Sequence, residues 1–119
     1  MLSGAKRFSR KIGNKVGNFI QRQTISRQKQ NGHIRGTAQY KNRVKAGKPT
    51  STWSNGSKAD RLTRKAFKKG SPMKGRPNGR EYNFGKQVGT SPSGKPQSSV
   101  RVHLDTRGRI HGHPSGKVK

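Results

Sequence analysis

The alternation of apolar and polar positions is clearest near the end of the chain. Val100, Val102 and Leu104 alternate with polar residues, and this period of two predicts a β-strand with one apolar face. The next four residues, 105–108, read Asp-Thr-Arg-Gly and suit a type I turn whose glycine takes a left-handed conformation. The pattern therefore predicts a β-hairpin over 99–114.

The turn determines which residues of the hairpin face each other. A three-residue loop with a bulge gives four opposed pairs: Asp105 with Arg109, Leu104 with Ile110, His103 with His111, and Arg101 with His113. One face is then apolar and needs a core, whereas the other face carries histidine and arginine. A register shifted by one residue would mix the two faces, which is disfavoured when one of them is buried.

A pattern with the period of a helix precedes the hairpin. Its apolar face consists of Ala59, Leu62, Thr63, Ala66 and Phe67, which predicts a helix from about Lys58 to Lys69. Ser57 and Asp60 form a capping-box pattern with aspartate in place of glutamate, and Gly70 with Pro72 ends the helix. We expect the Leu62/Phe67 face to cover the apolar face of the hairpin.

Short strands are expected between the helix and the hairpin. Candidates are Glu81–Phe84 and Lys86–Val88, and the segment Gly89–Gln97 is typical of a surface turn or ribbon. Residues 58–119 are therefore predicted to form a small α+β domain in which a helix packs on an antiparallel sheet with a C-terminal β-hairpin.

The first half of the chain is less regular. The residues Ala5, Phe8, Ile12, Val16, Phe19 and Ile20 lie at helical spacing and predict a basic helix, either loosely held or lying on a membrane surface. From Gln21 to Asn55 there is little periodicity, so this stretch is interpreted as a linker or arm, with His33 as a solvated polar residue. Trp53 is expected either to stack on a base or to pack on the helix. Residues 1–57 are thus predicted to be a basic, partly disordered or helical arm.

Charge narrows the choice of partner. The 119 residues include 29 Lys and Arg against 3 Asp and Glu, a net charge of +26, and only 24% are hydrophobic. Such a chain repels itself unless a polyanion supplies the opposite charge, and phosphate neutralisation releases counterions and drives binding. Nucleic acid is therefore the expected partner. The sequence has no long apolar run, so no membrane span is expected, and no Cys for disulfides, thiolate zinc sites or thiol nucleophiles.

The polar face of the hairpin contains the residues best suited to catalysis. His103 and His111 are opposed, with Cβ atoms expected about 4.5–5.5 Å apart, and His113 lies on the same face. Since imidazole titrates near pH 6.5, one ring can act as base and another as acid while Arg101 and Arg109 hold a phosphate. This set suits RNA cleavage by the ribose 2′-OH without a metal or other cofactor.

Two other interpretations remain open. A non-enzymatic ribosomal or nucleoid protein could carry the same histidines as polar, RNA-stacking residues. The spacing alone does not decide between catalysis and simple RNA binding. A metal site formed by His103, His111 and His113 is less favoured, because the nearest acid, Asp105, is expected in the turn.

Other basic residues are candidates for phosphate contact. Arg76 and Arg80 lie in a Gly/Pro-rich turn that lacks the Lys-Ser/Thr ending of a P-loop. Arg61, Lys65, Lys68 and Lys69 lie on the predicted helix, the last two at the end where the helix dipole favours cations.

Several short motifs resemble a family of bacterial polymorphic toxin domains. These motifs are Ala59-Asp60-Arg61-Leu62, Gly70 to Asn78, Phe84-Gly85, Val88-Gly89, Val100-Arg101-Val102-His103 and, most specific of all, Gly108-Arg109-Ile110-His111-Gly112-His113-Pro114. The family occurs at the C-terminus of large Rhs/YD-repeat and wall-associated proteins used in contact-dependent competition. The resemblance covers residues 58–117.

The resemblance implies a nuclease, most simply a ribonuclease that acts on tRNA or rRNA in the cytoplasm of a target cell. It implies delivery as part of a larger secreted or cell-surface protein and inhibition by an acidic immunity protein encoded by a neighbouring gene. It places His103, His111, His113, Arg101 and Arg109 in the active site. Residues 1–57 match nothing in the motif and are interpreted as a pre-toxin segment or an RNA-gripping arm. Because the chain starts at Met1 rather than after a delivery protein, an excised domain or a detached cassette is expected.

Overall fold

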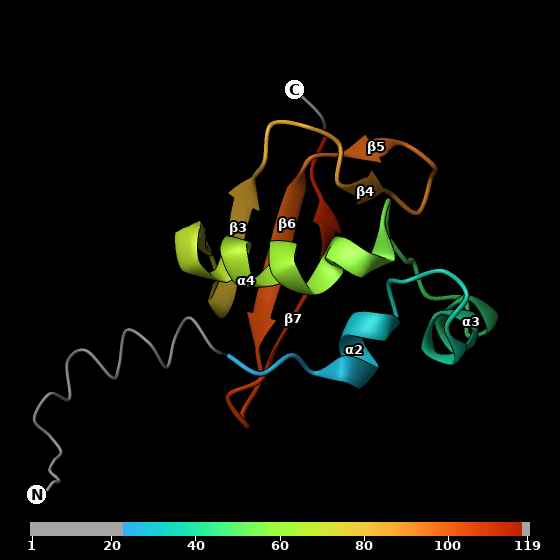
Figure 1. The fold of residues 1–119 in the computed structure, drawn as a ribbon, viewed down its shortest axis with the longest axis horizontal. Coiled ribbons are helices and arrows are strands. Elements are labelled where there is room, and N and C mark those ends of the chain that lie inside the picture. The colour runs from blue at the N-terminus through green and yellow to red at the C-terminus, as the bar shows by residue number, and fades with distance from the viewer. Residues whose placement is uncertain (1–22, 118–119) are drawn as a thin grey trace, which may run out of the picture.

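A computed structural model describes residues 23–117 of the chain, and the helix expected over residues 5–20 lies outside this part (Figure 1). The four-stranded antiparallel sheet has the order β2-β3-β6-β7, with β2 at Ser71–Met73, β3 at Arg76–Asn83, β6 at Ser99–Leu104 and β7 at Ile110–Ser115. A smaller antiparallel sheet has the order β1-β4-β5, with β1 at Thr52–Trp53, β4 at Gly89–Thr90 and β5 at Pro96–Gln97. The helices are α2 at Arg27–Asn31, α3 at Ala38–Lys45 and α4 at Ala59–Lys69, with a 3₁₀ turn η1 at Gly56–Lys58 before α4. The predicted α+β fold class is confirmed.

The register predicted for the β6–β7 hairpin is confirmed. Leu104 pairs with Ile110, His103 with His111, and Arg101 with His113. Gly108 has a φ of 77°, and its N–H donates to the carbonyl of Asp105 at 3.1 Å. The Asp105 carboxylate also accepts from the backbone N–H of Arg107 and of Arg109, each at 2.9 Å. Asp105 is therefore part of the turn.

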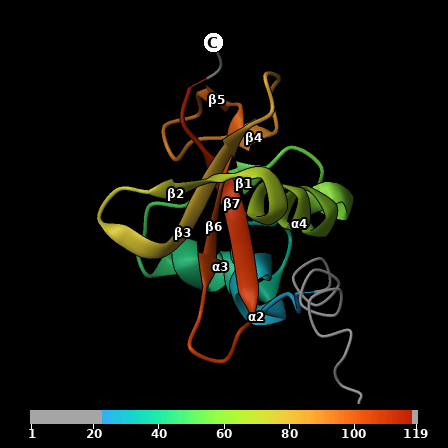
Figure 2. The ribbon, with the colours of Figure 1, turned by 90° about the vertical axis from the view of Figure 1, so that its left-hand side faces the viewer.

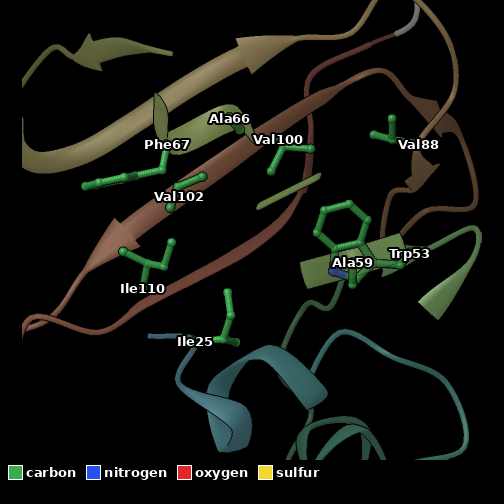
Figure 3. Close-up of a cluster of buried hydrophobic side chains, with 9 residues drawn as sticks. All are labelled: Ile25, Trp53, Ala59, Ala66, Phe67, Val88, Val100, Val102 and Ile110. Atoms are coloured by element: carbon green, nitrogen blue, oxygen red, sulfur yellow. The ribbon is translucent and has the colours of Figure 1, made fainter. Parts of the chain in front are cut away.

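The apolar face of the hairpin packs against α4, as expected. Val100, Val102 and Ile110 are fully buried, and they form one core with Ala66 and Phe67 of α4 (Figure 3). Helix α4 crosses this face of the sheet, as Figure 1 shows. The opposite face is thereby left for the polar residues of β6 and β7, because side chains alternate along a strand.

The start of α4 differs from the prediction. The N-cap position is Lys58 without a side-chain cap bond, and the capping box with Ser57 is wrong. Ser57 lies in the preceding 3₁₀ turn, where its N–H donates to Asn55 Oδ1 at 3.0 Å. Asp60 pairs instead with Arg27, the first residue of α2. The helix ends at Lys69 with Gly70 as its C-cap, as expected.

The expectation of a linker over residues 21–55 is wrong for the part that is described. The chain before α2 follows the outer edge of β7, where Ser26 N–H donates to the Ile110 carbonyl at 2.7 Å and Ile110 N–H donates to Thr24 at 2.8 Å. Ile25 and Trp53 belong to the hydrophobic core. The core therefore includes residues from both sides of the expected division at residue 57. Only 5% of the surface of Trp53 is exposed, so its ring packs in the core and is not available to stack on a base.

A buried glutamine completes this contact. Gln30 of α2 has no exposed surface, and its amide accepts from Gly112 N–H at 2.7 Å and donates to Thr63 Oγ1 at 2.9 Å. It thus connects α2, β7 and α4 at one point. Hydrogen bonding of this kind satisfies the edge of β7 that would otherwise be open to water.

The connecting segments agree with the prediction in outline. The strand expected at 81–84 is the second half of β3, which begins earlier, and the stretch 86–88 contains no strand. The ribbon expected over 89–97 is the short β4–β5 hairpin. None of the helices within residues 23–117 is long and apolar enough to cross a bilayer.

Candidate active site: a histidine cluster on the polar face of the sheet

A cavity of about 730 Å³ lies over the sheet face that α4 does not cover. In Figure 2 the sheet is seen between α4 on one side and α3 on the other. The cavity is lined from the sheet by Arg101, His103, His111 and His113, and from the segment around α3 by His33 and Arg43. Arg76, at the start of β3, and Pro92 and Gln97 of the β4–β5 hairpin also line it. A volume of this size falls in the usual range for ligand sites.

All four histidines of the chain meet in this cavity. The rings of His103 and His111 stack with centroids 5.1 Å apart and planes at 26°. His103 and His113 are 5.4 Å apart at 16°, and His113 and His33 are 4.8 Å apart at 24°. Ring faces this close are nearly in van der Waals contact, so a phosphate does not fit between them. It would meet the edges of the imidazoles instead.

Glycine at position 112 allows the backbone of β7 to lie close to α4. A Cβ built there would lie 2.5 Å from Thr63 Oγ1 and 3.0 Å from Thr63 Cγ2. Strand β7 thus approaches α4 with no space for a side chain, while His111 and His113 on either side point to the other face. This explains the His-Gly-His spacing in terms of packing.

Hydrogen bonds determine which nitrogen of each ring carries the proton in the neutral state. His113 Nδ1 lies 3.0 Å from the Pro114 carbonyl, which can only accept, so Nδ1 is the protonated nitrogen. His113 Nε2 is then an acceptor, and it lies 3.3 Å from His103 Nε2. His103 therefore donates its Nε2–H, which leaves the lone pair on His103 Nδ1.

Burial lowers the pKa of every histidine in the cluster. Loss of hydration is the main cause, and repulsion that a charged ring would meet from the other imidazoles adds to it; together they lower the pKa of His111 to about 4 and of His113 to about 3. The pKa of His103 and of His33 is also lowered, chiefly by burial. All four rings are thus neutral at pH 7 in the free protein.

Arg101 is oriented by an acid that the sequence interpretation did not single out. Its Nε donates to Glu81 Oε2 at 2.9 Å, and Ser115 Oγ donates to the same oxygen at 2.7 Å. Burial alone would raise the pKa of Glu81, but the hydrogen bonds from Ser115 and Arg101 lower it, so the ion pair persists at neutral pH. Within residues 23–117 the terminal NH₂ groups of Arg101 have no side-chain partner, and they are free to meet an anion.

The remaining predicted arginine of the site lies elsewhere. Arg109 donates from Nε to Asp105 at 3.2 Å and lines a second cavity, not the first. Its place is taken by Arg76, predicted as a phosphate contact, and by Arg43, which the sequence did not indicate. Arg43 is held by Thr50 Oγ1 at 3.2 Å and the Pro49 carbonyl at 3.0 Å.

The other predicted phosphate contacts are not brought to the cluster. Arg61, Lys65, Lys68 and Lys69 lie on α4, across the sheet from the histidines. Arg80 donates to the Phe67 carbonyl at 2.7 Å and lies 4.4 Å from the centre of the Phe67 ring, so it is bound to the helix side.

His33 was expected in solvent, and this is wrong. Its exposure is 7%, and its Nδ1–H donates to the Ser51 carbonyl at 2.9 Å. No pattern around His33 distinguishes it in the sequence, since it reaches the cluster through the packing of the segment between α2 and α3.

A metal site gains no support from this geometry. Among residues 23–117 no group of three or more His, Asp or Glu side chains is arranged to hold a metal ion. Rings stacked face to face do not direct three lone pairs at one point, as a tetrahedral site requires.

Comparison of the chain with known protein families, with characterised proteins and with solved structures gives no match. The resemblance to polymorphic toxins therefore depends on the sequence motifs alone, and the chemistry of the site is the remaining indication of a function.

Proposed function

We propose that this protein is a metal-independent ribonuclease that cleaves RNA by attack of a ribose 2′-OH, with His103 as general base and His111 as general acid. The observation that carries the proposal is the hydrogen-bonded series from the Pro114 carbonyl through His113 to His103, which leaves a lone pair on His103 Nδ1. His111 stacks beside it at 5.1 Å, so both ring edges can reach one phosphate.

The reaction proceeds as a transesterification. His103 Nδ1 takes the proton of the 2′-OH as the 2′ oxygen forms a bond to the adjacent phosphorus. The bond from phosphorus to the 5′ oxygen breaks, and His111 gives its proton to that oxygen. The products are a 2′,3′-cyclic phosphate and a free 5′-OH. Arg101 and Arg76 stabilise the negative charge that builds up on the phosphate oxygens.

The acid has to be charged before this step. His111 is neutral in the free protein because burial lowers its pKa to about 4. A bound phosphate brings negative charge next to the ring, which raises its pKa and favours the imidazolium. Protonation of the acid is therefore coupled to substrate binding, and an empty site holds no charged imidazole.

The test uses the purified full chain and total RNA in EDTA. We expect discrete fragments that end in cyclic phosphate, lost in His103→Ala and retained in the control Arg61→Ala on α4. DNA should remain intact, since it has no 2′-OH. Cleavage that requires added magnesium or zinc would contradict the mechanism.

A non-enzymatic RNA-binding protein is the alternative, and the neutral state of all four rings is the observation that favours it. In that case the wild type leaves RNA intact and His103→Ala has unchanged RNA affinity.

We further propose that the ribonuclease acts as a toxin on tRNA or rRNA of a target cell, delivered as part of a larger secreted or cell-surface protein. The resemblance of its motifs to polymorphic toxins and its charge of +26 support this, and an acidic immunity protein is the matching inhibitor. Expression should arrest growth, and co-expression of the neighbouring gene should relieve the arrest. Growth arrest that persists in His103→Ala would contradict a nuclease toxin.

A further inference from the structure

A second cavity of about 650 Å³ adjoins the histidine cluster. Its walls come from α2, α3 and the end of the β6–β7 turn, which lie in the lower half of the molecule in Figure 1. The two cavities share three lining residues: His33, Arg43 and His111. His103, in contrast, lines only the first cavity. His111 therefore lies at the boundary between the two.

The lining of the second cavity suits a nucleic-acid strand. Its cationic residues are Arg27, Lys29, Arg43, Lys48 and Arg109, and its amides are Gln28, Gln39 and Asn42. Cations neutralise phosphates, and amides bond to base edges or to the 2′-OH. None of the carboxylates within residues 23–117 lines this cavity.

Apart from Arg43, which also lines the first cavity, two of these cations are free to bind phosphate. Arg27 is paired with Asp60, and Arg109 with Asp105. Lys29 lies 3.9 Å from Asp105, but its side chain is 52% exposed, so the contact is weak. Lys48 has no ion pair within residues 23–117.

We propose that the second cavity binds the RNA strand on the 3′ side of the cleaved bond, which makes unpaired RNA the substrate. This rests on the proposed function. His111 gives its proton to the 5′ oxygen, and that oxygen belongs to the nucleotide downstream of the bond. The nucleotide that carries the attacking 2′-OH lies by His103 in the first cavity. The downstream nucleotides then continue past His111 into the second.

The concave shape of both cavities explains why the strand is unpaired. A duplex presents a wide, shallow minor groove and a continuous outer backbone, whereas a single strand can bend and turn its bases outward. Hollows of this size accept nucleotides one at a time, so a loop or an end of RNA is the form that fits.

The experiment has a binding arm that needs no cleavage. A fluorescent 2′-O-methyl RNA of eight nucleotides is titrated with the wild type, with Lys29→Gln/Lys48→Gln, and with the charge-matched control Lys68→Gln/Lys69→Gln on α4. Loss of two phosphate contacts should weaken binding about tenfold at 0.1 M salt and reduce the salt slope by about 1.4, from roughly 0.7 per phosphate. The control should change affinity less than about twofold. Equal losses in the two double variants would overturn the cavity's role.

A cleavage arm tests the direction of the strand. In 2′-O-methyl RNA with a single unmodified ribose, only the bond next to that ribose can be cut. Nucleotides are then added on either the 3′ or the 5′ side of this bond. The Lys29→Gln/Lys48→Gln variant should raise KM about tenfold for the 3′-extended substrate and leave the 5′-extended one unchanged. The reverse result would overturn the assigned direction. Absence of cleavage by the wild type would contradict the proposed function and the assigned strand direction. The binding experiment would still decide whether the second cavity binds RNA.

Discussion

The three histidines of the β6–β7 hairpin have different roles in the cluster. His103 has the free lone pair, His111 faces both cavities, and His113 holds His103 through Nε2 at 3.3 Å. His113 is itself fixed by its hydrogen bond to the Pro114 carbonyl. Its pKa is lowered to about 3, below the value of about 4 for His111. It is therefore a positioning residue, and not the acid or the base.

Substitution of His113 tests this difference. In His113→Leu we expect kcat to fall about tenfold with KM unchanged, because one hydrogen bond contributes about 0.5–1.5 kcal/mol and 1.36 kcal/mol is a factor of ten. His113→Gln offers an amide oxygen near the place of Nε2 and should recover most of the rate. Initial rates on a single-ribose oligonucleotide measure both parameters. Equal losses in the two variants, or a change in KM alone, would contradict the positioning role.

At the scale of elements, the short helix α2 closes the outer edge of the sheet and brings the first half of the chain to the site. It does so through Gln30, whose amide satisfies Gly112 and Thr63. The same segment delivers His33 and, further on, Arg43 to the cavity. The candidate site is consequently built from both halves of the chain.

Gln30→Ala should lower the free energy of unfolding by about 2–3 kcal/mol, because a buried donor and a buried hydroxyl each lose their partner. Gln28→Ala on the exposed side of the same helix is the control, with a change within about 0.5 kcal/mol. Urea denaturation followed by circular dichroism measures both. If the two variants unfold at the same urea concentration, Gln30 does not hold the edge.

Some elements of the fold were predictable from the sequence, and others were not. The hairpin register was predictable because apolar alternation and Gly108 are local signals, and they placed His103 opposite His111 correctly. The position of α2 was not predictable, because it depends on backbone hydrogen bonds to Ile110 and on the buried amide of Gln30. Neither interaction produces a periodic pattern of apolar residues in the sequence. His33 reaches the cluster through the same tertiary contacts, so its sequence neighbours reveal nothing.

At the scale of the whole molecule, charge and burial oppose each other at the site. All three acids of the chain are used in ion pairs, Asp60 with Arg27, Glu81 with Arg101, and Asp105 with Arg109. Three carboxylates cannot balance 29 cations, so the fold carries a strong positive field. The histidines stay neutral in this field because protonation would add charge in a half-buried place that is already positive.

The fold should therefore lose stability on mild acidification. The unfolded chain binds protons on histidine below about pH 6.5, whereas the folded chain does so only near pH 4 for His111 and pH 3 for His113, so the free energy of unfolding falls as the pH falls through this window. Allowing for the partial exposure of the rings, we expect a loss of about 2 kcal/mol between pH 6.5 and 5 at constant ionic strength. The lowered pKa of Glu81 acts in the same direction but mainly below its unfolded value of 4.5, so it adds little in this range. Urea unfolding across the series measures the slope, and His111→Gln should flatten it, because glutamine has no proton to gain. A stability that is constant or rises from pH 6.5 to 5 would mean that the imidazoles are charged in the folded protein, and the neutral cluster on which the base assignment of His103 depends would not exist.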